Sequence, residues 1–143
     1  FALGSFLKRL NNLKQNKGSF ILIGFYAQPR SKVEAHKYFI QFMTNLRRKH
    51  PNDKFIVAGD FNMTPWSPHF RDFLEVSGLE DSAKGNGVQP TWYALPSFCF
   101  GIPIDHVCFD KSFRVDARLV GPELGSDHRP VWVDFSIVSK DTD

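Results

Sequence analysis

Apolar and polar positions follow one another along the chain in a pattern that predicts strands and helices in mixed order. Residues 19–26 (SFILIGFY) form an apolar run bounded by turn-forming residues, as expected of a strand. Residues 55–58 (FIVA) form a second run, which ends at Gly59 and predicts a buried strand. Further strands are predicted at residues 105–109, 114–120 and 131–138, of which the last two alternate with period two.

The first ten residues, FALGSFLKRL, have a pattern that fits either a short helix or an edge strand. The polar stretch 11–18 is typical of a turn and leads into the strand at 19–26. We therefore predict a hairpin. One face of its second strand is formed by Phe20, Leu22, Gly24 and Tyr26.

Two segments carry helix signals. Ser31 and Glu34 have the spacing of a capping box, and the helix after them is predicted to reach about His50. Its apolar side would be formed by Val33, His36, Phe39 or Ile40, Phe42 or Met43, and Leu46. The second helix would begin at Pro68, with Ser67 as its cap, and end before Gly78, with Phe70, Phe73 and Leu74 inside it.

The order of elements is strand, helix, strand, helix and then three strands, which predicts an α/β layer. A chain of 143 residues with 42% hydrophobic and 15% aromatic residues suits one globular domain over residues 1–143, with most of the 15 Phe in its core. Cys99 and Cys108 are too few for a disulfide framework or a zinc set, and we expect buried free thiols in a reducing compartment.

Charge is distributed unevenly. Residues 1–50 hold ten Lys and Arg and a single acid, Glu34, although the net charge of the whole chain is only +3. Such a cationic region can attract a polyanionic partner, or it can consist of ordinary solvated charges. No apolar run approaches the length of a membrane span, and the chain as given is expected to be soluble, with a parent protein that is either cytoplasmic or tethered to a membrane.

Polar residues cluster at three predicted strand ends. Asp60 and Asn62 follow the buried run 55–58, at the carboxyl end where open α/β sheets place ligands. If this segment is extended, the two side chains point to the same side. The other clusters are residues 104–107 (IDHV) and 125–130 (GSDHRP).

The motifs GDFN, PIDHV and GSDHRPV, in this order, resemble the second half of the endonuclease/exonuclease/phosphatase superfamily, the metal-dependent phosphoesterases related to pancreatic deoxyribonuclease and the apurinic endonucleases. The resemblance covers residues 18–137, and TPWSPHFRDFL and PTW further resemble a bacterial subgroup. It implies a four-layer α/β/β/α sandwich of two halves, with a mixed, mostly antiparallel sheet and outer helices. This chain has material for one half: either it was cut from a longer protein, or the amino-terminal half has been lost.

The resemblance implies catalytic roles for four residues. Asp60 would accept the proton of the attacking water, and Asn62 would orient it or hydrogen-bond the transition state. Asp105 would pair with His128, which would act as an acid/base or bind the scissile phosphate. The structural alternatives are a turn at Asp60 and a buried Asp–His hydrogen bond.

By the same resemblance Asp127 would bind Mg²⁺ or Mn²⁺. The Glu and Asn that the first half contributes in the superfamily have no counterpart here. Because one carboxylate makes a poor Mg²⁺ site, we expect this chain to bind metal weakly by itself.

Further residues have two interpretations each. Tyr26 stands where many superfamily members have a histidine, and it would donate to a phosphate oxygen or be a core tyrosine. Trp66 and Trp92 would wall the pocket or pack in the core, and Ser126 and Arg129 would bind phosphate, unless Arg129 forms a surface salt bridge. His36 and His106 are interpreted as structural.

The sequence therefore predicts a metal-dependent phosphoesterase, with a phosphodiester, possibly a nucleic acid, as its substrate. A lipid or small-molecule phosphate ester is the alternative substrate, and a non-catalytic phosphate-binding relic is the alternative class of protein. The missing amino-terminal half is the expected partner. Without it, we expect an exposed apolar sheet face and self-association.

Overall fold

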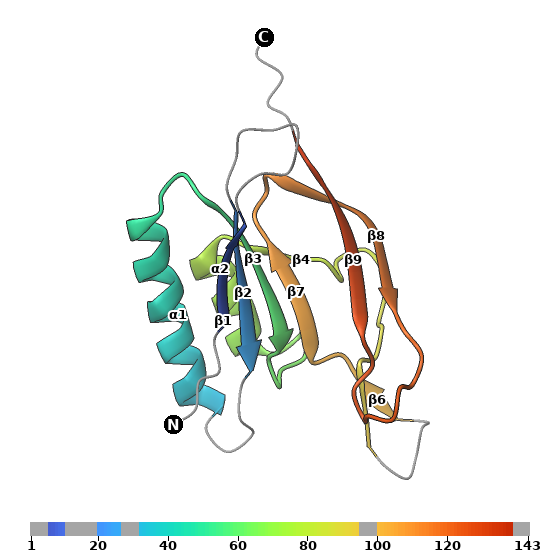
Figure 1. The fold of residues 1–143 in the computed structure, drawn as a ribbon. Helices are drawn as coiled ribbons and strands as arrows, with labels where there is room; N and C mark the ends of the chain where they lie inside the picture. Colours follow the sequence, from blue (N-terminus) through green and yellow to red (C-terminus); the bar gives the residue numbers. More distant parts are fainter. Residues whose placement is uncertain (1–5, 11–19, 27–31, 95–99, 139–143) are drawn as a thin grey trace.

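The fold was analysed in a computed structural model that describes residues 6–10, 20–26, 32–94 and 100–138. These residues form two helices and nine strands (Figure 1). In chain order they are β1 (Phe6–Leu10), β2 (Phe20–Tyr26), α1 (Lys32–Lys49), β3 (Lys54–Asp60), α2 (Pro68–Ser77), β4 (Glu80–Asp81), β5 (Trp92–Tyr93), β6 (Gly101–Ile102), β7 (Asp105–Phe109), β8 (Phe113–Val120) and β9 (Val131–Ile137).

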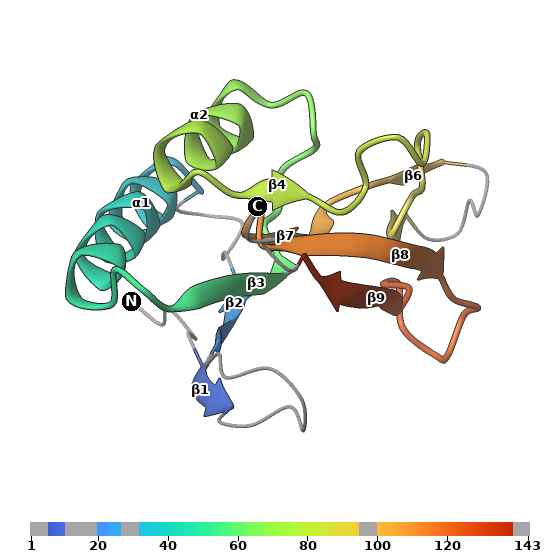
Figure 2. The same cartoon turned by 90° about the horizontal axis from the view of Figure 1, so that it is seen from above.

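Five strands form the main sheet, in the order β1-β2-β3-β7-β4. Only β2 and β3 run parallel, and the other neighbours are antiparallel. Helices α1 and α2 cover one face of the sheet, and the β8–β9 hairpin lies on the other side (Figures 1 and 2). The expected fold class, a mixed and mostly antiparallel α+β layer with outer helices, is confirmed.

The predicted hairpin at the start of the chain is confirmed. Phe6 to Leu10 form an edge strand that pairs antiparallel with β2, from Phe6 opposite Gly24 to Leu10 opposite Phe20. Ile21, Ile23 and Phe25 of β2 are buried toward the helices. The pairing therefore decides between the two interpretations of this segment, since the pattern alone fitted a helix as well.

Helix α1 has the expected bounds, although Ser31, its expected cap, lies outside the described residues. Met43 is buried and Phe42 is 37% exposed, so Met43 is the inward member of that pair. Arg47 near the carboxyl end does more than complement the helix dipole: its Nη2 lies 2.7 Å from Asp110 Oδ1, and its guanidinium lies over the Phe55 ring. This ion pair joins α1 to the segment after β7.

Helix α2 begins at Pro68 and ends at Gly78, whose φ of 66° is the left-handed conformation that favours glycine. Ser67 occupies the cap position, but its hydroxyl makes no capping bond and lies 3.7 Å from Met63 Sδ. After this helix, Glu80 and Asp81 form the short strand β4, which pairs antiparallel with the end of β7.

Two apolar clusters hold the layers together. The larger one lies between the sheet and the helices and is rich in aromatic rings; Phe25 stacks on Phe39 with ring centroids 4.0 Å apart. The smaller cluster joins Ile56 and Phe109 to the β8–β9 hairpin through Phe113 and Phe135. Burying each such side chain contributes roughly 1.5–3 kcal/mol.

Gly59 permits the close approach of β2 and β3 near their carboxyl ends. Its φ is 152°, and a Cβ at this position would overlap the backbone carbonyl of Phe25. The last pair of the ladder, Tyr26 opposite Asp60, follows directly. None of the helices among the described residues is long and apolar enough to cross a membrane.

Candidate active site

The candidate site lies where β2 and β3 end and β7 begins. Asp60, the last residue of β3, is the ladder partner of Tyr26 on one side and of Asp105 on the other. Because paired residues of adjacent strands project from the same face, the three side chains form one row. Tyr26 is 48% exposed and is therefore not a core tyrosine.

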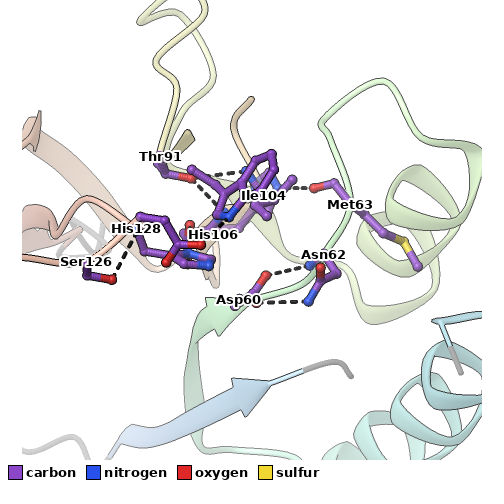
Figure 3. A network of polar contacts seen from close by, with 11 residues as sticks. Asp60, Asn62, Met63, Thr91, Ile104, His106, Ser126 and His128 are labelled. Carbon is purple, nitrogen blue, oxygen red and sulfur yellow. Dashed lines mark hydrogen bonds and ion pairs between the residues drawn. The ribbon is translucent and has the colours of Figure 1, made fainter. Parts of the chain in front are cut away.

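Asp60 and Asn62 are joined by two hydrogen bonds. The Asn62 backbone N–H donates to Asp60 Oδ1 at 2.7 Å, and the Asn62 side-chain amide donates to Asp60 Oδ2 at 2.9 Å (Figure 3). The expectation that this segment is extended is wrong, because Asn62 has a φ of 51°. The chain turns at Asn62, and Phe61 between the two polar residues is fully buried. The turn, rather than strand alternation, brings the side chains together.

Asp105 and His128 form the second pair. Nδ1 of His128 lies 2.9 Å from Oδ2 and 3.2 Å from Oδ1 of Asp105, and both side chains are partly buried. An imidazole held through Nδ1 by a carboxylate presents Nε2 for proton transfer or for a phosphate oxygen. The Ser126 hydroxyl accepts a hydrogen bond from the His128 backbone N–H at 3.1 Å and so shapes the loop.

Asp127 points to a different partner. Its Oδ2 accepts a hydrogen bond from the Trp92 indole Nε1 at 2.8 Å, and its backbone carbonyl accepts one from the Tyr93 N–H. The Trp92 hydrogen bond, followed by the nearby His128, lowers the pKa of the Asp127 carboxyl below its ordinary value. Trp92 is thus bound to the expected metal ligand, a contact that the sequence did not predict.

Arg129 and Trp66, two further predicted site residues, are both at least partly exposed. The Arg129 guanidinium packs over the Tyr93 ring, 5.1 Å from its centroid, and lines a groove with Pro90, Leu119 and Gly121. Trp66 is 56% exposed in the turn before α2. Neither is buried as a core residue would be.

Two buried residues that support the site were not predicted to do so. His106 Nε2 lies 2.8 Å from the Met63 carbonyl oxygen, and its Nδ1 lies 2.9 Å from Asp81 Oδ2. His106 thus holds the residue after Asn62, which gives a specific form to the structural role expected of it. Thr91 is fully buried behind Asp105. The PTW motif had drawn attention to the segment that contains Thr91, whereas no feature of the sequence pointed to Asp81.

The described residues do not assemble a metal site by themselves. They contain no group of three or more His, Cys, Asp or Glu side chains placed to hold an ion. Among them, the Asp60 and Asp127 carboxylates are hydrogen-bonded to Asn62 and Trp92. A divalent cation at this end of the sheet would need ligands beyond the ones described here.

The described residues form an α+β layer with a carboxylate–amide pair and a carboxylate–imidazole pair at its strand ends. The model of the Endonuclease/Exonuclease/phosphatase family matches residues 11–128, and the chain belongs to this family. Family members are hydrolases that act on phosphate esters. None of the curated protein sequences matches the chain.

Several solved structures share the fold. The human Nocturnin catalytic domain with bound sulfate is 20% identical, with a TM-score of 0.70 over 94% of this chain and 53% of its own. A Bacteroides thetaiotaomicron mannosyl-6-phosphatase is 21% identical, with a TM-score of 0.61 over 87% and 54%. D. rerio TDP2 complexed with a single-strand DNA product is 15% identical, with a TM-score of 0.65 over 91% and 60%. The chain thus spans little more than half the length of these proteins.

Proposed function

We propose that the protein containing this chain is a metal-dependent phosphoesterase, nuclease-like by its sequence motifs, and that this chain supplies the carboxyl-terminal part of its catalytic domain. The observation that best supports this proposal is the adjacency of the Asp60–Asn62 and Asp105–His128 pairs at one end of the main sheet. Phosphoester hydrolysis needs a proton acceptor for water and a donor for the leaving oxygen, and the two pairs supply one each.

In the proposed mechanism Asp60 accepts a proton from water as the water oxygen attacks phosphorus. Asn62 keeps the Asp60 carboxylate oriented through its two hydrogen bonds. His128, held by Asp105, then gives a proton to the leaving oxygen as the P–O bond breaks, or binds a non-bridging oxygen as imidazolium. Tyr26, in the same row, donates a hydrogen bond from its hydroxyl to a phosphate oxygen.

The remaining predicted site residues have supporting roles in this proposal. Ser126 and Arg129 bind phosphate or the substrate beyond it, and Trp66 and Trp92 border the pocket. Mg²⁺ or Mn²⁺ is the proposed cofactor, with Asp127 as the contribution of this chain and the other ligands supplied from outside the described residues.

The remaining ligands of the proposed divalent cation must come from another part of the protein. We propose that this partner is an amino-terminal segment of the same domain. The chain covers only 53% and 54% of two of the solved structures that match, so the proposal leaves room for a second layer-forming half. The two-stranded β8–β9 sheet covers only part of a five-stranded one, and its open edges are where additional strands would pair.

Two substrate classes remain in the proposal, a nucleic acid phosphodiester and a lipid or small-molecule phosphate ester. The test is hydrolysis by the full-length protein, with and without Mg²⁺ or Mn²⁺, of single-stranded DNA, a phospholipid and a sugar phosphate. Metal-dependent turnover that is lost in Asp60→Ala supports the proposal. Absence of turnover on every substrate, together with phosphate binding, would instead identify a non-catalytic relic.

A further inference from the structure

Thr91 lies behind the Asp105–His128 pair and is fully buried. Its hydroxyl oxygen accepts two backbone hydrogen bonds, from the Ile104 N–H at 3.1 Å and from the Asp105 N–H at 3.0 Å (Figure 3). A hydroxyl oxygen has two lone pairs, so both acceptor positions are used. One side chain therefore holds the point at which the chain enters β7.

The backbone of Thr91 binds two other segments. Its carbonyl oxygen accepts a hydrogen bond from the Arg129 N–H at 2.6 Å, and its own N–H donates to the Ile102 carbonyl at 3.1 Å. Trp92 and His128 then form a bridge, and the Tyr93 N–H donates to the Asp127 carbonyl. The segment beginning at Thr91 thus holds the loop that carries His128.

Asp105 and His128 are 23 residues apart in the sequence: Asp105 begins β7, and His128 lies in the loop between β8 and β9. Thr91 is bonded to the backbone of Asp105 and to that of Arg129, the neighbour of His128. Thr91 therefore links the backbones on both sides of the pair, although no described hydrogen bond joins it to the side chain of Asp105 or of His128.

We propose that Thr91 is the positioning residue of the Asp105–His128 pair: its hydroxyl fixes Asp105, and its carbonyl fixes the His128 loop. The inference concerns the geometry of the pair, and only its catalytic consequence rests on the proposed function. Thr91→Val keeps the shape and removes the acceptor, leaving two buried N–H groups unpaired. Thr91→Ser keeps the hydroxyl.

The experiment is NMR of the His128 ring in the full-length protein labelled with ¹⁵N-histidine. In the wild type and in Thr91→Ser we expect a single tautomer with a downfield Nδ1–H resonance, as a carboxylate-bound imidazole gives. In Thr91→Val that resonance should be lost, with both tautomers populated. Thr44→Val removes an exposed helix hydroxyl in the same way and should leave the resonance unchanged.

An unchanged Nδ1–H resonance in folded Thr91→Val would overturn the proposal. If that variant does not fold, Thr91→Ala is measured instead, because its smaller side chain lets water reach the two N–H groups. An unchanged Nδ1–H resonance in Thr91→Ala would likewise overturn the proposal. Fast exchange of the Ile104 and Asp105 amide protons in the wild type would also overturn it. Because none of these readouts needs turnover, an inactive protein with the expected spectra would count against the proposed function alone.

Discussion

Asp60 and Asp105 lie directly opposite each other across β3 and β7, and each carboxylate has a different partner. Asp60 accepts hydrogen bonds from the neutral Asn62 amide, whereas Asp105 is bound to the His128 imidazole. Two facing carboxylates repel each other unless one is neutralised. In the proposed mechanism the separate partners divide the roles: Asp105 is matched with a group that can become a cation, and Asp60 is left as the proton acceptor.

This division predicts different consequences for the two carboxylates. We expect Asp60→Asn and Asp105→Asn each to lower kcat by roughly two orders of magnitude or more, with the fold retained. In Asp105→Asn, the His128 tautomer should also change, because an amide can donate to the ring. Steady-state kinetics and ring ¹⁵N shifts check both, and a near-normal kcat for Asp60→Asn would contradict the assignment of the base.

Replacement of Asn62 separates its backbone role from its side-chain role. Both Asn62→Gly and Asn62→Ala remove the amide that holds Asp60, so both should lower activity to a similar extent. Because φ is 51°, only Ala should be strained, and it should lower the free energy of unfolding by about 1 kcal/mol relative to Gly. Urea denaturation measures this difference. Equal stability of the two variants would show that the left-handed turn is not retained in solution.

The Trp92 indole should tune the ionisation of Asp127. Trp92→Phe removes the hydrogen bond that is the main cause of the lowered pKa, so the pKa of Asp127 should rise toward its ordinary value. In the wild type the carboxylate stays ionised to lower pH, and the acid limb of any metal-dependent activity should therefore move to higher pH in the variant. A ¹³C titration of the carboxyl group checks the shift. Trp66→Phe is the matched control, and it should change neither the pKa of Asp127 nor the position of the acid limb.

His36 should make stability depend on pH. It is 2% exposed among aromatic rings, and within the described residues neither ring nitrogen has a hydrogen-bond partner. Burial, followed by the charge of His69, lowers its pKa from 6.5 to about 4. Above pH 6.5 the His36 ring is neutral in both the folded and the unfolded protein. Below pH 6.5 the ring is protonated first in the unfolded chain, so the free energy of unfolding falls as the pH drops toward 4.

The size of this effect is at most about 3.5 kcal/mol, from roughly 1.4 kcal/mol for each unit of pKa difference. Urea unfolding of the wild type and of His36→Leu between pH 4 and 7 isolates it from the other acids and histidines. The difference in unfolding free energy should change across this range by an amount of that order. Parallel pH profiles for the two proteins would show that the ring is not buried in its neutral form.

Self-association of this chain should involve the β8–β9 hairpin. Leu119 and Trp132 are ladder partners there and are 61% and 50% exposed. An exposed apolar pair beside open strand edges favours contact with another copy. Sedimentation should show association that rises with concentration and weakens in Leu119→Lys. Val76→Lys, which changes an equally exposed apolar residue on α2, should leave it unaltered.

The elements could largely be predicted from the sequence because their signals are local. The strand at 105–109 has the expected bounds, and Pro68 and Gly78 mark the ends of α2 as expected. The pairing of Asp105 with His128 was predicted by family resemblance, and the described geometry contains that contact. Local pattern and recognised motifs therefore account for the framework and for the main pairs.

The rest depends on contacts between distant segments. Nothing in the sequence around Asp81 indicated that it would be buried against His106, 25 residues away. The hydrogen bond from Trp92 to Asp127 joins residues that are 35 positions apart, and it holds the carboxylate on the indole N–H. Asn62 was misjudged for a local reason: an asparagine after a strand tolerates the left-handed conformation, and the extended one was assumed.

Asp60 and Asp105 lie in the main sheet, whereas His128 lies in the loop between β8 and β9, and the two layers meet through a small group of rings, chiefly Phe109 and Phe113 against Phe135. A slight slip between these layers would part His128 from the Asp60 end while leaving every strand and helix intact. Warming should therefore abolish the activity of the protein at temperatures at which its circular dichroism spectrum is still that of the native state. The loss of activity on heating would then result from loosening of this aromatic contact between the layers, which occurs before the fold itself unfolds.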